Sequence, residues 1–409
     1  MRRILFFLGL SLFLNFYVFN GVKYFISDLD SRTSLWFKIG YWVLIAASYG
    51  ALLFSMSQFR ISPTTFWTKA TMSFFFILFV IQLIWAIFMG VDDLVRLVQW
   101  FIGLFSKSAE SAGSGISRKS FIMKTGAFLA TGFGAALTYG VVRGSHRYQV
   151  VRQKLTIPGL PESLKGLKLV QISDIHSGSF WNVVGVKKGV DLIKNENPDL
   201  VFFTGDIVNN VASEMEPYID TFSQIKAKHG VYSIMGNHDY GEYVPGFRKD
   251  QLPENKAAIA NVHKQLGWDL LLNENRILDI AGEKLAVVGI ENWGSKMHFS
   301  RYGDLSKAME GVDQNWPTLL LSHDPSHWRA QVLKEFPMIN AMFSGHTHGM
   351  QFGIETGGWK WSPVKYVYPE WAGMYEENNQ KLYVNRGFGY LGFPGRLGIW
   401  PEITVFELA

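Results

Sequence analysis

The chain has 409 residues, of which 48% are hydrophobic and 18% are charged, and its formal net charge is +5. The charged fraction is low for a wholly water-soluble protein, and much of the lysine and arginine lies beside apolar segments, which indicates orientation in a membrane and not binding of nucleic acid. There is no cysteine, so disulfides and thiol catalysis are excluded, and a metal ion would need oxygen and nitrogen ligands.

The first third of the chain is predicted to be a membrane domain. Four segments are apolar and long enough to cross a bilayer: residues 4–20, Trp36–Met56, Met72–Met89 and Phe121–Val142. Val91–Phe105 contains Asp92, Asp93 and Arg96, so it is either a short further span or an interfacial amphipathic helix. We therefore expect an all-α membrane domain of about five helices over residues 1–145, in an integral protein of the cell membrane.

The charges between these segments predict the side of the membrane on which the rest of the chain lies. Basic clusters occur at Arg2–Arg3, Arg60–Lys69 and Lys107–Lys119. If all three face the cytoplasm and Val91–Phe105 crosses, the following domain is extracytoplasmic; without that crossing the conclusion reverses. Ser117–Lys124 also resembles a twin-arginine export signal with lysine in place of the second arginine. The simpler interpretation is an inside-facing anchor, and both place the next domain outside.

From about Arg143 the sequence pattern changes to short apolar strands alternating with segments of helical spacing. This predicts a layered α/β domain over residues 146–409. The expected helices are Val183–Asn195, Pro217–Lys228, Lys256–Leu266, Gly303–Met309 and Ser326–Phe336. The expected strands are Leu167–Ile172, Leu200–Thr204, Val231–Met235, Trp268–Leu272, Arg276–Ile280, Lys284–Ile290, Thr318–Leu321, Ile339–Ser344, 381–385 and 402–407. Gly353–Glu370, rich in Trp, Gly and Pro, is predicted to be a long surface loop that helps to shape a site.

Short polar motifs follow five of these strands. They are Ser173-Asp174-Ile175-His176, Gly205-Asp206, Gly236-Asn237-His238-Asp239, Ser322-His323-Asp324 and Gly345-His346-Thr347-His348-Gly349. Open α/β sheets hold their ligands in a crevice outside the strand ends. We therefore expect the carboxylates, imidazoles and amide of these motifs to meet in one metal site.

The chemistry of these side chains indicates the kind of ion. Asp174 and His176 are two residues apart, as are His346 and His348, so each pair would lie on one side of an extended segment. A mixed set of carboxylate, amide and imidazole ligands suits Mn, Fe, Co, Ni or Zn better than Ca, which prefers oxygen alone. Five other histidines are interpreted as ordinary polar residues: His146, His229, His263, His298 and His327.

In their order along the chain, these motifs resemble those of the calcineurin-like metallophosphoesterases, over roughly residues 165–409. The ending is similar to that of the membrane-associated phosphodiesterase branch, on the strength of Asn385–Gly389, Phe393–Gly398 and Pro401–Ile403. The resemblance implies a double β-sandwich flanked by helices, with two divalent metal ions. One departure is Asn209, where the family often has aspartate three residues after the second motif's acid.

The resemblance also implies a role for each motif residue. Asp174, His176, Asp206 and His348 would hold one ion, and Asp206, Asn237, His323 and His346 would hold the other, so that Asp206 bridges them. His238 would be the proton donor to the leaving oxygen or a stabiliser of the transition state, oriented by Asp239. Arg396 is our candidate for a contact to the substrate phosphate, with a surface or structural arginine as the alternative.

The expected activity is hydrolysis of a phosphodiester or pyrophosphate bond by direct attack of a metal-bound hydroxide. A place beside a bilayer suggests a lipid or cell-envelope substrate, and no nucleic acid is expected as a partner. The alternatives are a phosphomonoesterase, or a non-catalytic, metal-stabilised membrane scaffold or sensor. Retention of His238 beside every candidate ligand argues against the scaffold.

Overall fold

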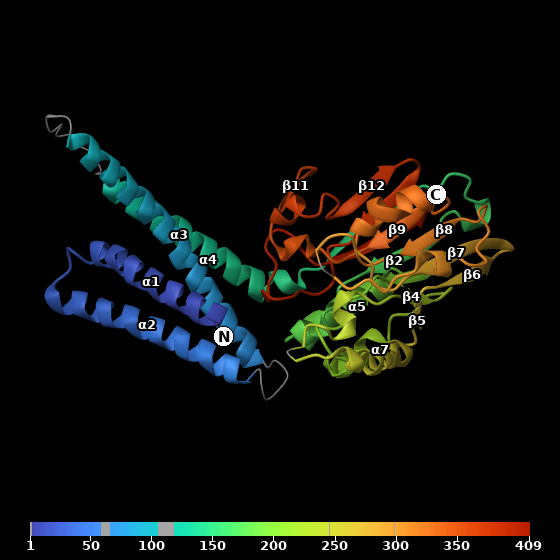
Figure 1. The fold of residues 1–409 in the computed structure, drawn as a ribbon, viewed down its shortest axis with the longest axis horizontal. Helices are drawn as coiled ribbons and strands as arrows, with labels where there is room; N and C mark the ends of the chain where they lie inside the picture. Colours follow the sequence, from blue (N-terminus) through green and yellow to red (C-terminus); the bar gives the residue numbers. More distant parts are fainter. Residues whose placement is uncertain (1, 59–65, 105–117, 245, 298) are drawn as a thin grey trace. The chain divides into compact units, whose positions relative to one another are not determined.

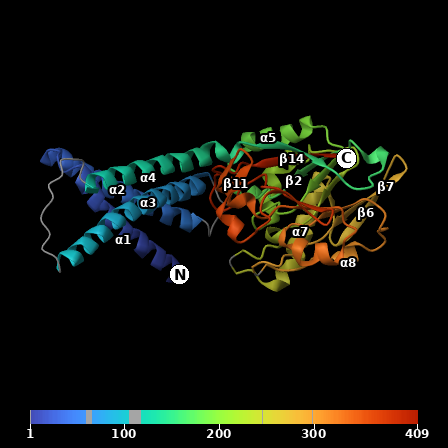
Figure 2. The same cartoon turned by 90° about the horizontal axis from the view of Figure 1, so that it is seen from above.

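The computed structural model describes residues 2–58, 66–104, 118–244, 246–297 and 299–409. The chain forms two compact units, Met1–Tyr139 and Gly140–Ala409. Figures 1 and 2 show helices alone in the first unit and mixed strands and helices in the second.

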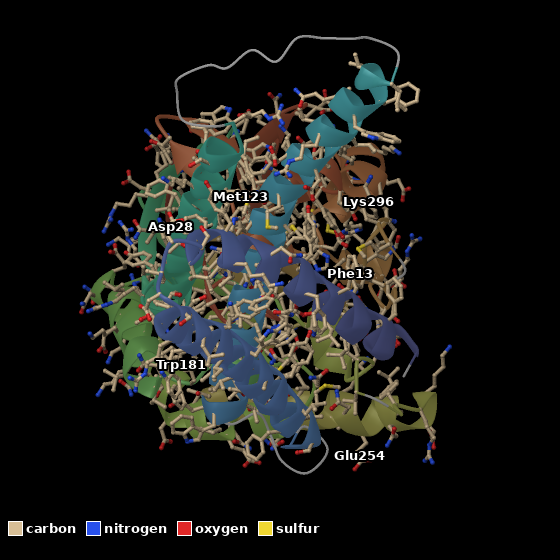
Figure 3. The ribbon with its side chains drawn as sticks, turned by 90° about the vertical axis from the view of Figure 1, so that its left-hand side faces the viewer. Phe13, Asp28, Met123, Trp181, Glu254 and Lys296 are labelled. Atoms are coloured by element: carbon tan, nitrogen blue, oxygen red, sulfur yellow. The ribbon has the colours of Figure 1, made fainter. Side chains whose placement is uncertain are left out.

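In its described residues, the first unit is built from four long apolar helices. They are α1 (Arg2–Phe25), α2 (Ser31–Gln58), α3 (Phe66–Gly103) and α4 (Arg118–Val142), the last of which extends into the second unit. Within the described residues, all four are long and apolar enough to span a membrane. Large apolar side chains cover their surface, including Phe13, labelled in Figure 3, which is 69% exposed. A surface of this kind is suited to lipid.

The helix count is four where we expected about five, because Met72–Met89 and the region from Val91 onward form the single helix α3. The charges in this region do not interrupt it, since Arg96 pairs with Asp92 one turn earlier, at 2.6 Å. At 1.5 Å per residue, α3 is about 57 Å long, which exceeds a hydrocarbon core of about 30 Å. Residues 105–117, and with them the predicted loop Ser106–Ser117, lie outside the described part of the chain.

The helices of the first unit meet through small and polar side chains. A Cβ added at Gly134 of α4 would lie 2.3 Å from Ile81 of α3, so glycine allows the two helices to approach closely. In the interior, Gln82 donates to Asn15 Oδ1 at 2.6 Å, and the Tyr41 hydroxyl donates to the carbonyl of Asn15. Close packing and hydrogen bonds between helices are what stabilises membrane bundles, because lipid supplies no hydrophobic drive between them.

The second unit contains two six-stranded sheets. The first has the order β1 (Gln149–Leu155), β14 (Glu402–Leu408), β2 (Lys168–Ile172), β3 (Leu200–Phe203), β4 (Val231–Ser233) and β5 (Asp269–Leu270). The second has the order β12 (Gly373–Glu377), β13 (Gln380–Val384), β9 (Ala341–Ser344), β8 (Thr318–Leu321), β7 (Glu283–Gly289) and β6 (Glu274–Ile280). Strands β2 to β5 are mutually parallel, as are β7, β8, β9 and β13.

Alternation of side chains along the strands creates three layers of core. In β3, Phe202 faces the space between the sheets, whereas Val201 and Phe203 face the helices that cover the first sheet. In β8, Leu319 and Leu321 pack between the sheets and Leu320 faces the helices over the second sheet. Each fully buried side chain of this size contributes about 1.5 to 3 kcal/mol. The predicted double β-sandwich flanked by helices is confirmed.

Helices cover the outer faces of both sheets. The α-helices are α5 (Val183–Asn195), α6 (Ile219–Phe222), α7 (Leu252–Leu266), α8 (Leu305–Ala308) and α9 (Leu333–Glu335). Single-turn or irregular helices are η1 (Gly144–His146), η2 (Glu162–Leu164), η3 (Ser177–Ser179), η4 (Ala212–Tyr218), η5 (Asn237–Tyr240), η6 (Lys249–Gln251), η7 (Trp328–Val332), η8 (His348–Gln351) and η9 (Pro363–Tyr366). The helix expected at Pro217–Lys228 is shorter than predicted, and the loop expected at Gly353–Glu370 contains the hairpin β10 (Ile354–Thr356)–β11 (Trp359–Trp361).

Candidate metal centre

The polar motifs come together at the ends of β2, β3, β4, β8 and β9, as expected. Close approach of these loops depends on glycine. A Cβ added at Gly345, just after β9, would lie 2.1 Å from Asp174 Oδ2. At the same place, the backbone N–H of His346 donates to both oxygens of Asp174, at 3.0 Å each.

Five of the predicted ligands have a left-handed backbone. The φ angles are 51° at Asp174, 48° at His176, 62° at Asp206, 71° at His346 and 50° at His348. The prediction that Asp-x-His and His-x-His lie on extended segments is therefore wrong. Non-glycine residues with positive φ are uncommon, and they concentrate at functional sites where the surrounding structure holds them.

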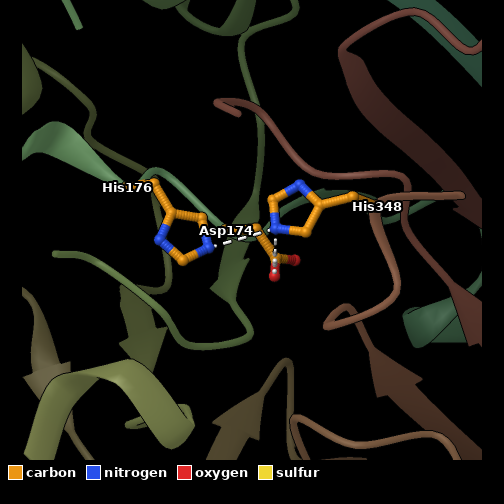
Figure 4. Close-up of side chains that lie close together, drawn as sticks. All are labelled: Asp174, His176 and His348. Atoms are coloured by element: carbon orange, nitrogen blue, oxygen red, sulfur yellow. Dashed lines mark hydrogen bonds and ion pairs between the residues drawn. The ribbon is translucent and has the colours of Figure 1, made fainter. Parts of the chain in front are cut away.

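The first group of potential ligands consists of Asp174, His176 and His348, all buried. His176 Nε2 lies 3.0 Å from His348 Nε2, which in turn lies 3.3 Å from Asp174 Oδ1 (Figure 4). Three side chains that follow the ends of β2 and β9 thus place their ligand atoms within 4.8 Å of one another.

The second group consists of Asp206, His323 and His346. His323 Nε2 lies 3.2 Å from Asp206 Oδ2, and His346 Nδ1 lies 3.3 Å from His323 Nε2. Asn237 joins this group, since its Oδ1 is 2.8 Å from His346 Nδ1. Asp206 Oδ2 is also 3.5 Å from His176 Nε2, so one carboxylate oxygen borders both groups.

His323 is held in place from outside the group. Its Nδ1 donates to the carbonyl oxygen of Thr204 at 2.7 Å, which directs Nε2 toward Asp206 and fixes the ring as metal-site histidines usually are. Burial lowers the pKa of His323, but the carboxylate of Asp206 outweighs burial and raises it to about 10. The buried carboxylate of Asp206 therefore favours a positive charge next to it, at the position of His323 Nε2.

Whether metal ions fit the site depends on whether its side chains need positive charge and offer suitable ligand atoms. Four imidazoles, two carboxylates and an amide oxygen lie close together, and several of their contacts join two potential ligand atoms directly, such as His176 Nε2 and His348 Nε2. Buried carboxylates need compensating positive charge, and nitrogen and oxygen atoms in this mixture are ligands for first-row divalent ions. The residues present fit two such ions, one at each group.

His238 lies beside the two groups, with its ring 4.9 Å from that of His176. Its Nδ1 donates to the carbonyl oxygen of Asn209 at 2.7 Å, which leaves Nε2 to give or take a proton. The Asn209 side chain pairs with Ser179 Oγ. The departure from the family's usual aspartate thus leaves the contact to His238 intact, because that contact uses the backbone.

Asp239 does not orient His238 as we expected. Its carboxylate accepts four backbone N–H groups, from Asp206 and Gly236 at Oδ2 and from Ile207 and Val208 at Oδ1. Burial and the charge of Asp206 raise the pKa of Asp239 to about 7, while these donors favour its ionised form. Asp239 is therefore a positioning residue that fixes the loops after β3 and β4.

Arg396 is not at the rim of the site. It is fully buried, and its guanidinium donates to the carbonyl oxygens of Arg386, Gly387 and Gly389. Its Nη2 lies 3.2 Å from His348 Nδ1. The structure therefore supports the alternative of a structural arginine, which holds the loop 386–389 next to the candidate metal ligand His348.

Three residues near the site carried no role in the sequence prediction. Tyr243 accepts a hydrogen bond from Asn237 Nδ2 at 2.9 Å, which orients the amide so that Oδ1 faces His346. The Tyr368 hydroxyl lies 3.0 Å from His346 Nε2 and 3.3 Å from Asp324 Oδ2. Asp324 directly follows the motif residue His323, so the sequence could have indicated that it lies near the site. The two tyrosines lie in loops outside the motifs, where no sequence pattern indicates a role.

A double β-sandwich with two adjacent Asp/His groups at its strand ends is the arrangement that the sequence resemblance implies for a metal-dependent phosphoesterase. Comparison with known families agrees. Residues 167–350 match the family model "Calcineurin-like phosphoesterase", and residues 1–145 match "Probable Calcineurin-like phosphoesterase, transmembrane domain".

Several curated proteins are similar to the chain. A "Transmembrane protein with metallophosphoesterase domain" from Danio rerio is 30% identical over 73% of this chain and 65% of its own length. The "Uncharacterized metallophosphoesterase YkuE" of Bacillus subtilis is 29% identical over 72% of this chain and 98% of its own. The "UDP-2,3-diacylglucosamine pyrophosphatase LpxG" of Chlamydia muridarum is 27% identical over 60% and 82%.

By its residues 167–350 the chain belongs to the calcineurin-like phosphoesterases, and its residues 1–145 match the transmembrane domain of such proteins, with four candidate spans among the described residues. The family uses a dinuclear centre of divalent ions, which the two groups of side chains accommodate. The chain therefore combines a metallophosphoesterase domain with a segment of membrane-spanning helices.

Proposed function

We propose that the chain hydrolyses a phosphodiester or pyrophosphate bond in an amphiphilic substrate, such as a lipid or a cell-envelope precursor. The observation that carries this proposal is the pair of buried groups sharing Asp206, with His238 alongside. Similarity to a protein named as a pyrophosphatase of a diacylated sugar nucleotide supports this substrate class.

We propose the following roles for the site residues. Asp174, His176, Asp206 and His348 hold one ion, and Asp206, Asn237, His323 and His346 hold the other. When bound, two divalent ions supply Lewis acidity at the phosphoryl group and lower the pKa of water toward neutrality. His238, held by the carbonyl of Asn209, gives a proton from Nε2 to the leaving oxygen. Asp239 keeps Asp206 and Asn237 in register by holding the backbone of both loops.

The test uses the full chain purified in detergent, with Mn supplied and then removed by a chelator. A chromogenic phosphodiester, the matching monoester and a sugar-nucleotide pyrophosphate carrying acyl chains are compared. Faster cleavage of the diester or pyrophosphate supports the proposal, and preference for the monoester makes the chain a phosphatase.

Two variants separate an enzyme from a scaffold. His238→Ala removes the proton donor and spares the ligands, so ion content is expected to stay while hydrolysis falls by about 10²- to 10⁴-fold. Asn237→Ala is expected to lower both. If the wild-type chain binds ions but cleaves none of the three substrates, the scaffold alternative is favoured.

We also propose that the domain boundary lies at residues 145/146 and that the catalytic unit is extracytoplasmic. With four crossing helices, both ends of the membrane unit lie on one side, so the three basic clusters cannot all face the cytoplasm. The cluster at the start of α4, Arg118, Lys119 and Lys124, favours a cytoplasmic position for that end. The chain after Val142 then lies outside, together with Arg2–Arg3 and the basic cluster between α2 and α3. If those two clusters face the cytoplasm instead, the catalytic unit is cytoplasmic, which is the reversal expected when Val91–Phe105 makes no crossing of its own.

The absence of cysteine makes sidedness simple to test. Glu283→Cys, at the exposed first residue of β7 beside the β6–β7 turn, provides a single thiol. Labelling by a membrane-impermeant maleimide in intact cells is expected, and labelling only after lysis places the catalytic unit in the cytoplasm.

A further inference from the structure

Exposed apolar side chains gather in one part of the second unit. Ten large apolar residues after Val142 are exposed in its described part, and five of them lie within eighteen residues. These five are Met350, Ile354, Trp359, Tyr366 and Val367, with Trp359 57% and Tyr366 75% exposed. We call them the 350–367 face. It comprises the β10–β11 hairpin and the turns on either side.

Within the second unit, the 350–367 face is joined to residues 140–146, the segment in which the last apolar span ends. The apolar span that contains α4 continues to His146, and its residue Gly140 accepts a hydrogen bond from the backbone of Arg396 at 3.1 Å. The next residue, Leu397, accepts from the backbone of Gly353 at 3.0 Å. Two consecutive residues therefore join the two segments. Arg396 is bonded to Gly140, near the end of the span, and Leu397 is bonded to Gly353, at the base of the hairpin.

A second pair of exposed apolar residues borders the same point. Val183 and Val184 begin α5 and are 49% and 67% exposed. The neighbouring Gly185 packs against η1, since an added Cβ would lie 2.7 Å from the ring of His146. Seven of the ten exposed apolar residues of the described part thus belong to the 350–367 face or to the start of α5, and both are in contact with the segment 140–146 or with its partner loop.

The composition of the face fits a membrane–water interface. Tryptophan and tyrosine concentrate at headgroup depth, where an apolar ring can be buried while its polar edge stays wet. Glu355 is paired with Arg386 and Glu370 with Arg329, whereas among the described residues Lys360 and Lys365 form no ion pair. The remaining charge is positive and complements anionic lipid headgroups.

We propose that the 350–367 face docks on the headgroup layer of the membrane that the helices span. Trp359 and Tyr366 enter the interfacial region, and Lys365 faces the lipid phosphates. Tethering by α4 keeps the face beside the bilayer, so weak apolar and ionic contacts suffice to seat it.

Docking has a consequence for the metal centre, which rests on the function proposed above. The docked segment is joined to the ligand loop, because Ser362 Oγ donates to the carbonyl of Gly349 at 2.8 Å. Tyr368, two residues after Tyr366, contacts His346 at 3.0 Å. Seating the face would therefore hold the centre at the depth of lipid phosphates, so that a lipid-linked substrate need not leave the bilayer.

The experiment uses the full chain and its lack of cysteine. Trp359→Cys and Tyr366→Cys are each labelled with an environment-sensitive fluorophore and reconstituted into phosphatidylethanolamine–phosphatidylglycerol vesicles. Glu283→Cys is the matched control, because the β6–β7 turn lies at the opposite end of the second unit from β11 (Figures 1 and 2). Emission is compared with and without lipids that carry a nitroxide quencher near the headgroup.

We expect blue-shifted emission and quenching at positions 359 and 366, and neither at position 283. Two results overturn the proposal: labels at all three positions equally exposed to water, or burial at 359 and 366 that lipid quenchers do not reach, which would mean that protein covers the face. Neither readout depends on activity. A chain that docks but hydrolyses nothing would refute the proposed function alone.

Discussion

The carboxylate of Asp239 offers the sharpest test of how the centre is built. It is completely buried and accepts four backbone N–H groups from the loops after β3 and β4. In Asp239→Asn, one carboxylate oxygen becomes an NH₂ group, which cannot accept, so two of the four donors lose their partner. Each buried donor left unpaired costs about 1 to 3 kcal/mol, which gives about 2 to 6 kcal/mol in total.

That loss is large against a stability of about 5 to 15 kcal/mol for a typical domain. At about 2 to 4 °C per kcal/mol for a large domain, the melting temperature of the second unit should fall by on the order of 10 °C. The measurement is thermal unfolding in detergent with a chelator present, so that lost ion binding does not contribute.

Asp174→Asn is the matched control. Asp174 is equally buried but accepts a single backbone N–H, from His346, and asparagine tolerates its left-handed backbone. We expect Asp174→Asn to lose activity with a much smaller fall in melting temperature. If Asp239→Asn has the same melting temperature as the wild-type chain yet is inactive, the carboxylate acts in the chemistry and our structural interpretation is refuted.

Three further variants test other contacts. Tyr243→Phe removes the acceptor that orients Asn237, and we expect ion affinity to fall about 10- to 100-fold, measured by Mn titration of activity; unchanged affinity would show that the amide needs no support. Arg396→Lys cannot reproduce a fork of bonds to three carbonyls, so we expect a lower melting temperature with unchanged KM, whereas a raised KM alone would restore the substrate contact first predicted. Arg386→Met leaves Glu402 buried without its partner, at a cost of about 3 to 5 kcal/mol in urea unfolding; adding Glu402→Gln should recover part of it, and no recovery would argue against the pair as the cause.

The sequence predicted the sheet strands and the meeting of motifs because both depend on local patterns. Phe202 and Leu320 lie in uninterrupted apolar runs, which indicate strands buried on both faces. Five such strands bring their ends together whatever the details of the loops. The pattern of strands alone therefore predicts that the Asp, His and Asn side chains form one site.

What the sequence could not show depends on contacts between distant segments. Arg396 is flanked by glycine and leucine, a pattern equally compatible with exposure, and only its carbonyl partners from residues 386–389 show that it is structural. Asp239 adjoins His238 in sequence, yet its partners come from another loop. The charges at Asp92, Asp93 and Arg96 favoured a separate short span or an interfacial helix over Val91–Phe105, because the pairing of Asp92 with Arg96 is formed only within the continuous helix α3.

The position of β14 bears on how the protein is made. This strand follows all the others in sequence, yet it lies in the first sheet between β1, to which it is parallel, and β2, to which it is antiparallel. During translation the membrane helices emerge first, and the first sheet stays open until residues 402–408 have left the ribosome. A chain stopped shortly before them would remain anchored in the bilayer with an unfinished sheet, where the exposed edges of β1 and β2 invite aggregation. Completion of the first sheet therefore depends on a strand that is synthesised after all the others in that sheet.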